Sequence, residues 1–162
     1  MSLNHNLIKG ADIRNNQQIL NNLPKEGLCK CWARRKELEI ILGKLNLNFA
    51  EIHNQLVNEG DYFCIFVGAR NSLRKRVQEH LNGPDDKSTL WKSIRGLLGY
   101  APYDFMDNLY FECIDENQLN DTRETAKNKL LEGDKFYVLN IDDNKHKLAK
   151  KVKPILSKSR KK

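Results

Sequence analysis

The feature that most constrains the fold is an apolar run without a charged residue, Tyr62 to Val67, which ends at Gly68. Such a run bounded by a glycine is typical of a strand that is buried on both faces. A helical pattern begins soon after it, because Leu73, Val77 and Leu81 recur every four residues. The sequence therefore predicts a central strand that leads directly into an amphipathic helix.

Similar patterns predict the rest of a small domain. Gly27 to Trp32 alternates loosely between apolar and polar residues, and Leu109 to Ile114 is a second mostly apolar run, so both are read as strands. Residues 136–139 are read as a short extended piece. Helical spacing occurs in the ranges 34–45, 49–58, 73–81, 90–98 and 122–131, and again in the tail after residue 145. We therefore expect an α+β fold in which five or more helices flank a small three-stranded sheet.

Charge is distributed unevenly along the chain. The formal net charge is +7, but residues 145–162 hold nine Lys or Arg and no Asp or Glu, which leaves residues 1–144 with a net charge of −2. A second basic stretch, residues 70–95, holds seven Lys or Arg and three Asp or Glu. Two cationic segments on an otherwise acidic chain favour a polyanionic partner. For the tail alone, a solubilising lysine-rich segment is an equally good interpretation.

Length, hydropathy and cysteine pattern narrow the class of protein. A chain of 162 residues is the size of one ordinary domain. No apolar stretch approaches the roughly 18 residues of a transmembrane helix, and the first residues lack the apolar core of a signal peptide. The four cysteines form neither a CxxC zinc pattern nor a disulfide framework, which favours buried structural thiols. We therefore expect a cytoplasmic protein that does not associate with a membrane.

The candidate chemistry lies on the helix that follows the central strand. Arg76 and His80 are four residues apart, so they lie one above the other beside the apolar face of this helix. An arginine can hold phosphate oxygens with two N–H groups, and a histidine can donate a hydrogen bond or transfer a proton. The pair therefore suits a phosphodiester. The alternative is a solvated basic face with a surface histidine.

Around this helix the sequence resembles a known family. Phe66 to Gly68, followed by Leu73 to Leu81, is similar to the second half of the GIY-YIG endonuclease signature. In that signature a YIG tripeptide precedes a helix that bears an essential Arg and often a His one turn later. Gly27 to Cys29 stands where the GIY tripeptide belongs, and residues 88–90 and 138–146 also resemble segments of one branch of the family. The resemblance spans residues 27–144.

The resemblance implies both an organisation and an activity. Residues 1–23 are an N-terminal extension, residues 24–144 a GIY-YIG-like nuclease domain with a helical insert at 34–60, and residues 145–162 a basic C-terminal tail. The implied activity is hydrolysis of DNA phosphodiesters with one Mg²⁺ or Mn²⁺ ion. In such nucleases a tyrosine hydroxyl positions or deprotonates water, the helix arginine stabilises the phosphorane, and a later glutamate holds the metal.

Only part of this machinery is retained. By resemblance, the candidate catalytic residues are Arg76, His80, Cys29 and Phe66. Cys29 and Phe66 stand at the two tyrosine positions, so both phenolic hydroxyls are missing. Lys127 stands at the glutamate position, and Glu124, one turn earlier, is the nearest carboxylate and the candidate metal ligand. Losing a general base typically costs about 10²- to 10⁴-fold in rate, which weakens the case for efficient catalysis.

Two functions follow, and DNA is the expected partner in both. The first is a DNA endonuclease with weakened or rearranged catalysis, in which Glu124 or Glu112 supplies the carboxylate and Cys29 or His80 assists the water. The second is a degenerate member of the fold that binds nucleic acid without cutting it. The candidate binding residues are the tail together with Arg70, Arg74, Lys75, Arg76 and Lys92. A third class, a protein-interaction domain, is favoured if DNA binding is absent.

Overall fold

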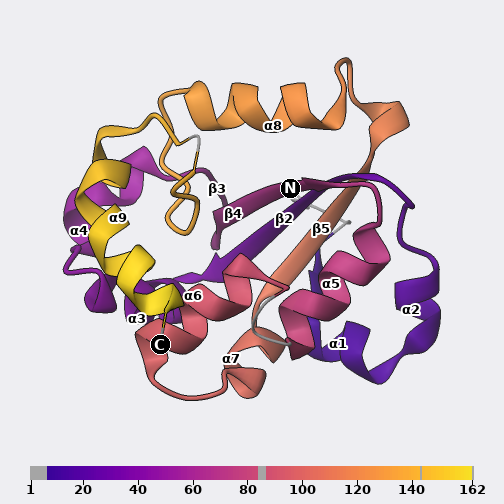
Figure 1. Cartoon of the computed structure of the whole chain (residues 1–162), viewed down its shortest axis with the longest axis horizontal. Helices are drawn as coiled ribbons and strands as arrows, with labels where there is room; N and C mark the ends of the chain where they lie inside the picture. The colour runs from indigo at the N-terminus through magenta and orange to yellow at the C-terminus, as the bar shows by residue number, and fades with distance from the viewer. Residues whose placement is uncertain (1–6, 84–86, 143, 162) are drawn as a thin grey trace.

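The computed structural model describes residues 7–83, 87–142 and 144–161, and within them five strands form one antiparallel sheet. The strand order is β1-β5-β2-β4-β3 (Figure 1). The strands are β1 (Ile8–Lys9), β2 (Gly27–Arg34), β3 (Asn58–Glu59), β4 (Tyr62–Arg70) and β5 (Tyr110–Asp115). The three long strands are the three that the sequence predicts.

The prediction of a three-stranded sheet is nevertheless wrong, because each edge of the sheet gains one further strand. β1 pairs with β5, and β3 pairs with β4. Each of these edge strands has two residues. Two residues are too few to show an alternating pattern, so their pairing depends on contacts that only the folded chain provides.

Helices cover both faces of the sheet, as the α+β expectation requires. In the described residues they are α1 (Gly10–Asn15), α2 (Gln17–Asn21), α3 (Arg35–Lys44), α4 (Phe49–Ile52), α5 (Leu73–Asn82), α6 (Thr89–Leu98), α7 (Tyr103–Asp107), α8 (Arg123–Glu132) and α9 (Lys147–Arg160), with single 3₁₀ turns at His53–Gln55 and Glu116–Gln118. The helix expected over 49–58 is shorter, because α4 ends at Ile52 and the chain turns toward β3. None of the described helices combines the length and apolar character that a membrane crossing needs.

The alternation of β2 divides the sheet between two cores. Cys29 and Cys31 face the larger core, which also contains buried residues of α3, α5 and α6. Leu28 and Trp32 face a smaller core, which includes Leu131 of α8. In Figure 1, α8 accordingly lies on one side of the sheet, and α5 and α6 lie on the other.

The extended piece expected at residues 136–139 is confirmed only at its start, where Phe136 forms a parallel bridge with Leu56, and Val138 and Leu139 form a buried turn at the outer edge of β4. The backbone N–H of Leu139 donates to the carbonyl of Ile65. The Asn140 side chain then takes the place of a neighbouring strand, because its Oδ1 accepts from Val67 N at 2.9 Å and its Nδ2 donates to Val67 O at 2.9 Å. One amide therefore satisfies both backbone groups of a residue at the sheet edge.

The basic tail folds back as a helix rather than fraying. His146 caps α9, because its Nδ1 accepts from Leu148 N at 3.1 Å. Val152 and Leu156 are buried against the larger core. α9 packs on α6, and this contact is close: a Cβ atom added to Gly96 would lie 2.0 Å from the carbonyl oxygen of Ser159.

We therefore expect Gly96→Ala to lower the free energy of unfolding by about 1–3 kcal/mol, the usual cost of overpacking. Gly43→Ala is the matched control, since Gly43 also lies in a helix but has no atom within 4 Å of an added Cβ. Alanine is the better helix former, so this control should raise stability by about 0.5–1 kcal/mol. Urea unfolding followed by circular dichroism measures both changes, and equal stabilities would show that α6 and α9 are not in this close contact.

Candidate nucleic-acid interface

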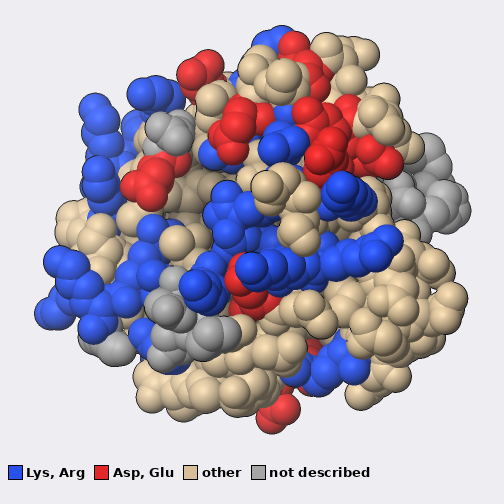
Figure 2. Space-filling model, turned by 45° about the vertical axis from the view of Figure 1, so that its right-hand side comes forward, with Lys and Arg blue, Asp and Glu red and all other residues tan. Residues whose placement is uncertain are grey.

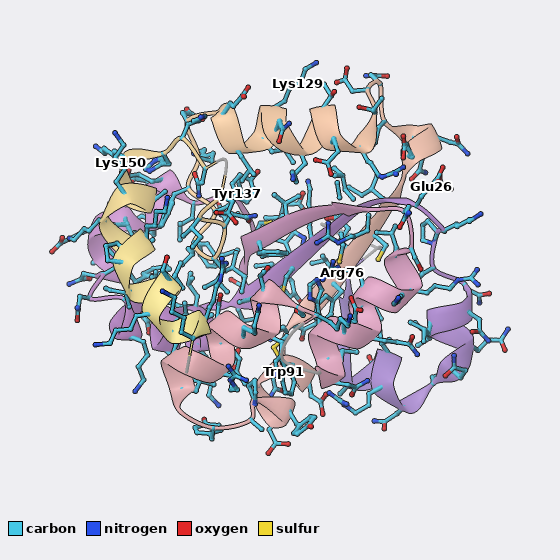
Figure 3. The ribbon with its side chains drawn as sticks, in the orientation of Figure 1. Glu26, Arg76, Trp91, Lys129, Tyr137 and Lys150 are labelled. Atoms are coloured by element: carbon cyan, nitrogen blue, oxygen red, sulfur yellow. The ribbon has the colours of Figure 1, made fainter. Side chains whose placement is uncertain are left out.

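α5 follows β4 as the sequence predicts, and it carries both candidate catalytic groups. Leu73, Val77 and Leu81 are buried against the larger core. Arg76 points to the space below β4, near the middle of the molecule (Figure 3). The sequence placed His80 beside the apolar face of this helix, at its edge. In the structure His80 is instead buried in the core, with only 1% of the residue exposed.

His80 lies between two aromatic rings in the core. Its ring contacts Phe66 edge to face, with centroids 5.7 Å apart, and stacks on Phe111 at 6.2 Å. Burial lowers the pKa of His80 well below its ordinary value of 6.5, and the charges of Arg76 and Arg70 lower it further. The imidazole is therefore neutral at neutral pH.

Ser88 links His80 to the start of α6. Its Oγ accepts from Trp91 N at 3.0 Å, which caps α6, and lies 2.6 Å from His80 Nδ1. When the hydroxyl donates its hydrogen to Nδ1, the neutral ring carries its proton on Nε2. His80 Nε2 is buried and has no hydrogen-bond partner within the described residues.

The guanidinium of Arg76 has polar partners at Nη1 but no hydrogen-bond partner at Nε among the described residues. Its Nη1 donates to the carbonyl of Lys87 at 2.6 Å and lies 3.4 Å from Glu79 Oε1. Its Nε is buried without a partner in the described ranges, and only 14% of its side chain is exposed. Burial lowers the pKa of Arg76, and the nearby positive charge of Arg70 lowers it further.

These groups line a small cavity that we call the arginine pocket. Its walls are Phe66, Gly68, Arg70, Arg76, His80 and Thr89, and its volume is about 10 Å³. This is the space of one water molecule or one ligand oxygen. Arg76 and His80, whose buried nitrogens Nε and Nε2 lack hydrogen-bond partners among the described residues, therefore both line a space that fits a single acceptor atom.

A larger cavity of about 150 Å³, which we call the edge hollow, adjoins the arginine pocket. The two share Phe66, Gly68, Arg70 and Thr89 as lining residues. The edge hollow runs along the outer edge of β4 and is also lined by Lys127 of α8, Asn140, Asp142 and Arg160 of α9. Figure 2 shows the corresponding surface character: Lys and Arg form a band across the middle of this face, and Asp and Glu gather above it.

The two residues at the tyrosine positions fill space without supplying proton chemistry. Phe66 is a wall of both cavities. Cys29 is buried on β2 opposite Cys113 of β5. A hydrogen bond with Cys113, and then burial, raise the pKa of the Cys29 thiol well above its usual range, so Cys29 stays a neutral thiol.

The described carboxylates do not form a metal site. No group of three or more His, Cys, Asp or Glu side chains is close enough to hold an ion in the part of the chain that the structure describes. Glu124 lies 3.1 Å from Lys127 Nζ in an ion pair, is 59% exposed, and lines neither cavity. Glu112 accepts a hydrogen bond from Trp32 Nε1 at 3.0 Å, on the face of the sheet away from α5. Where Mg²⁺ needs oxygen ligands, the edge hollow presents an ammonium group, so the residues present do not fit the metal.

The predicted cationic residues separate into two groups. Arg70 lines both cavities. Arg74 instead turns toward the carbonyl of Leu23, at 3.4 Å. Lys75 is exposed on α5 and Lys92 is half-buried on α6, and neither lines the two cavities.

Of two further cations at the edge hollow, Lys127 was not among the predicted binding residues, and Arg160 was included only as part of the tail. Lys127 was considered only as a replacement for a metal-binding glutamate. Arg160 belongs to a tail whose lysine-rich composition gives no indication that one guanidinium turns inward. The apolar spacing of Val152 and Leu156 was the available signal, since it predicts a packed helix and therefore one fixed face.

Comparison with known proteins agrees with this geometry. The model of the GIY-YIG catalytic domain family matches residues 29–125, more than half of the chain. No curated protein and no solved structure matches the chain significantly. The matched range covers most of β2 and all of β4, α5 and β5, and so contains Arg76 and His80. The chain is therefore a member of the GIY-YIG catalytic domain family and has its nuclease-type fold.

Proposed function

We propose that this domain binds phosphate groups of nucleic acid at the arginine pocket, and that it does so without metal-dependent hydrolysis. The observation that carries the proposal is the pair of buried N–H groups, Arg76 Nε and His80 Nε2, which share one cavity and lack partners among the described residues. A phosphate oxygen can accept from both.

Energetics favour an acceptor in this cavity. A buried donor without a partner costs about 1–3 kcal/mol, so the pocket is more stable when an oxygen atom fills it. Water can supply such an oxygen, but Arg70 and Arg76 place positive charge beside it, and each disfavours the other when no anion is present. A phosphate oxygen satisfies the donors and offsets both charges.

His80 acts in this proposal as a neutral hydrogen-bond donor. Its Nδ1 is occupied by Ser88, and its Nε2 carries the proton, so neither nitrogen offers a lone pair to a water molecule. Cys29 is a neutral buried thiol, and Phe66 has no ionisable group. None of these three residues supplies the general base that the family's tyrosines provide.

Phosphodiester hydrolysis is a second candidate, favoured by the family match and by one feature of the pocket. Two N–H donors, one of them in the Arg76 guanidinium, would stabilise the charge that develops on a phosphorane. The activity would then be slow, because the groups that activate water are missing. The same preparation of the protein tests both candidates.

Replacing Arg76 should weaken binding strongly. We expect Arg76→Gln to reduce affinity for a DNA oligonucleotide roughly tenfold or more, because a charge-assisted contact in a buried site is lost. The slope of log Kd against log salt concentration should fall by about one. Arg35→Gln is the control, since Arg35 is an exposed arginine on α3 and should leave both values unchanged. Fluorescence anisotropy measures them, and equal behaviour of the two variants would contradict the proposal.

Incubation of the protein with supercoiled plasmid and Mg²⁺ should produce no nicking above that of a buffer control. The reason is that the edge hollow presents Lys127, Arg70 and Arg160 to an incoming metal ion, with Asp142 as the one carboxylate among its described lining residues. Gel electrophoresis of the open-circular form is the measurement. Nicking by the wild type that disappears in Arg76→Gln would instead establish the second candidate.

The neutral state of His80 predicts a specific pH dependence. At pH 6.5, where an ordinary histidine is half protonated, ¹⁵N NMR should show His80 still neutral with its proton on Nε2. Because the folded pKa lies below the unfolded value, the unfolded chain binds the proton more readily. The free energy of unfolding should therefore fall as pH drops below about 6.5, and this loss should be smaller in His80→Gln. A His80 resonance that titrates near 6.5 would contradict the buried neutral donor.

A further inference from the structure

The edge hollow gathers cations from three separate elements. Arg70 lies at the end of β4, Lys127 in the middle of α8 and Arg160 in the last turn of α9. Asp142 is the one carboxylate among the described lining residues. Its lining therefore carries three positive charges against one negative charge, which favours an anionic ligand.

Arg160 is held in place at this site. Its Nε donates to Ser93 Oγ at 2.7 Å, and its Nη2 donates to the carbonyl of Leu139 at 3.1 Å. Burial lowers its pKa, while Asp142 opposes that change. A guanidinium that is fixed by two hydrogen bonds loses little further conformational freedom when a ligand binds.

Lys127 differs from its neighbours on α8. Its side chain is largely covered and reaches the edge hollow, whereas Lys129 lies on the outer side of the helix and pairs with Asp121 at 2.8 Å (Figure 3). Glu124, which is 59% exposed, pairs with Lys127 Nζ at 3.1 Å. An ammonium group has three N–H donors, so this ion pair leaves donors that a ligand in the hollow can use.

The edge hollow and the arginine pocket are neighbouring cavities. Phe66, Gly68, Arg70 and Thr89 line both, so ligand groups in the two cavities would lie close to one another. A strand with one phosphate oxygen in the arginine pocket thus places a further polar group at the edge hollow.

We propose that the edge hollow is a second phosphate subsite, in which Lys127 and Arg160 contact a phosphate group directly and no divalent metal is needed. This inference rests on the proposed function and extends it. The phosphate can be an internal diester of the bound strand or the monoester at a strand end, since both present the same oxygens to these cations.

The test measures anisotropy of three oligonucleotides of one sequence, with a 5′-phosphate, a 3′-phosphate or no terminal phosphate, each in EDTA and in Mg²⁺. Lys127→Gln should weaken binding in EDTA roughly five- to tenfold and reduce the salt slope by about one. Lys129→Gln is the matched control on the same helix and should bind as the wild type does. Arg160→Gln should weaken binding similarly, and a parallel thermal unfolding curve shows whether that variant keeps its fold.

Each outcome decides the proposal. An equal loss in Lys127→Gln for all three oligonucleotides supports an internal phosphate in the hollow, and a loss confined to one phosphorylated end supports a terminal phosphate. Lys127→Gln that binds like Lys129→Gln, or wild-type binding that requires Mg²⁺, overturns the subsite while leaving binding at Arg76 intact. Absence of any wild-type binding would overturn the proposed function itself.

Discussion

The site depends on positive charges that lie close together in a partly buried space. Arg76 is desolvated beside Arg70, and both disfavour a further proton on His80. Glu79 offsets this only in part, from a distance of 3.4 Å. An arrangement of this kind is costly when empty and is stabilised by an anion. The positive charges that, after burial, help to keep His80 neutral therefore also favour an anionic ligand.

The differences from an efficient nuclease share one physical character. At each position that the family resemblance aligns with a catalytic group, the residue present lacks the hydroxyl or carboxylate of an active nuclease. Phe66 has the ring but no hydroxyl, Cys29 is a neutral buried thiol, and Lys127 carries a positive charge that would repel a metal ion. A scaffold changed in this way can keep its fold and its affinity for polyanions while its chemistry declines, because folding and binding depend on packing and charge.

The long strands and the helices were predictable from the sequence wherever the apolar pattern was long and periodic. The run from Tyr62 to Val67 and the helical spacing after it predicted β4 and α5. The two edge strands were not predictable, since two residues have no period. His80 was placed beside the apolar face, although a position three residues after Val77 and one before Leu81 also permits burial. Arg160 and Asn140 could not be assigned, because their roles depend on contacts between segments far apart in the chain.

The origin of Arg160 in the last turn of α9 ties the edge hollow to the packing of that helix. The guanidinium is fixed by Ser93 of α6 and by the carbonyl of Leu139, and α9 lies in close contact with α6 at Gly96. A change that separates these two helices would therefore also remove a positive charge from the edge hollow.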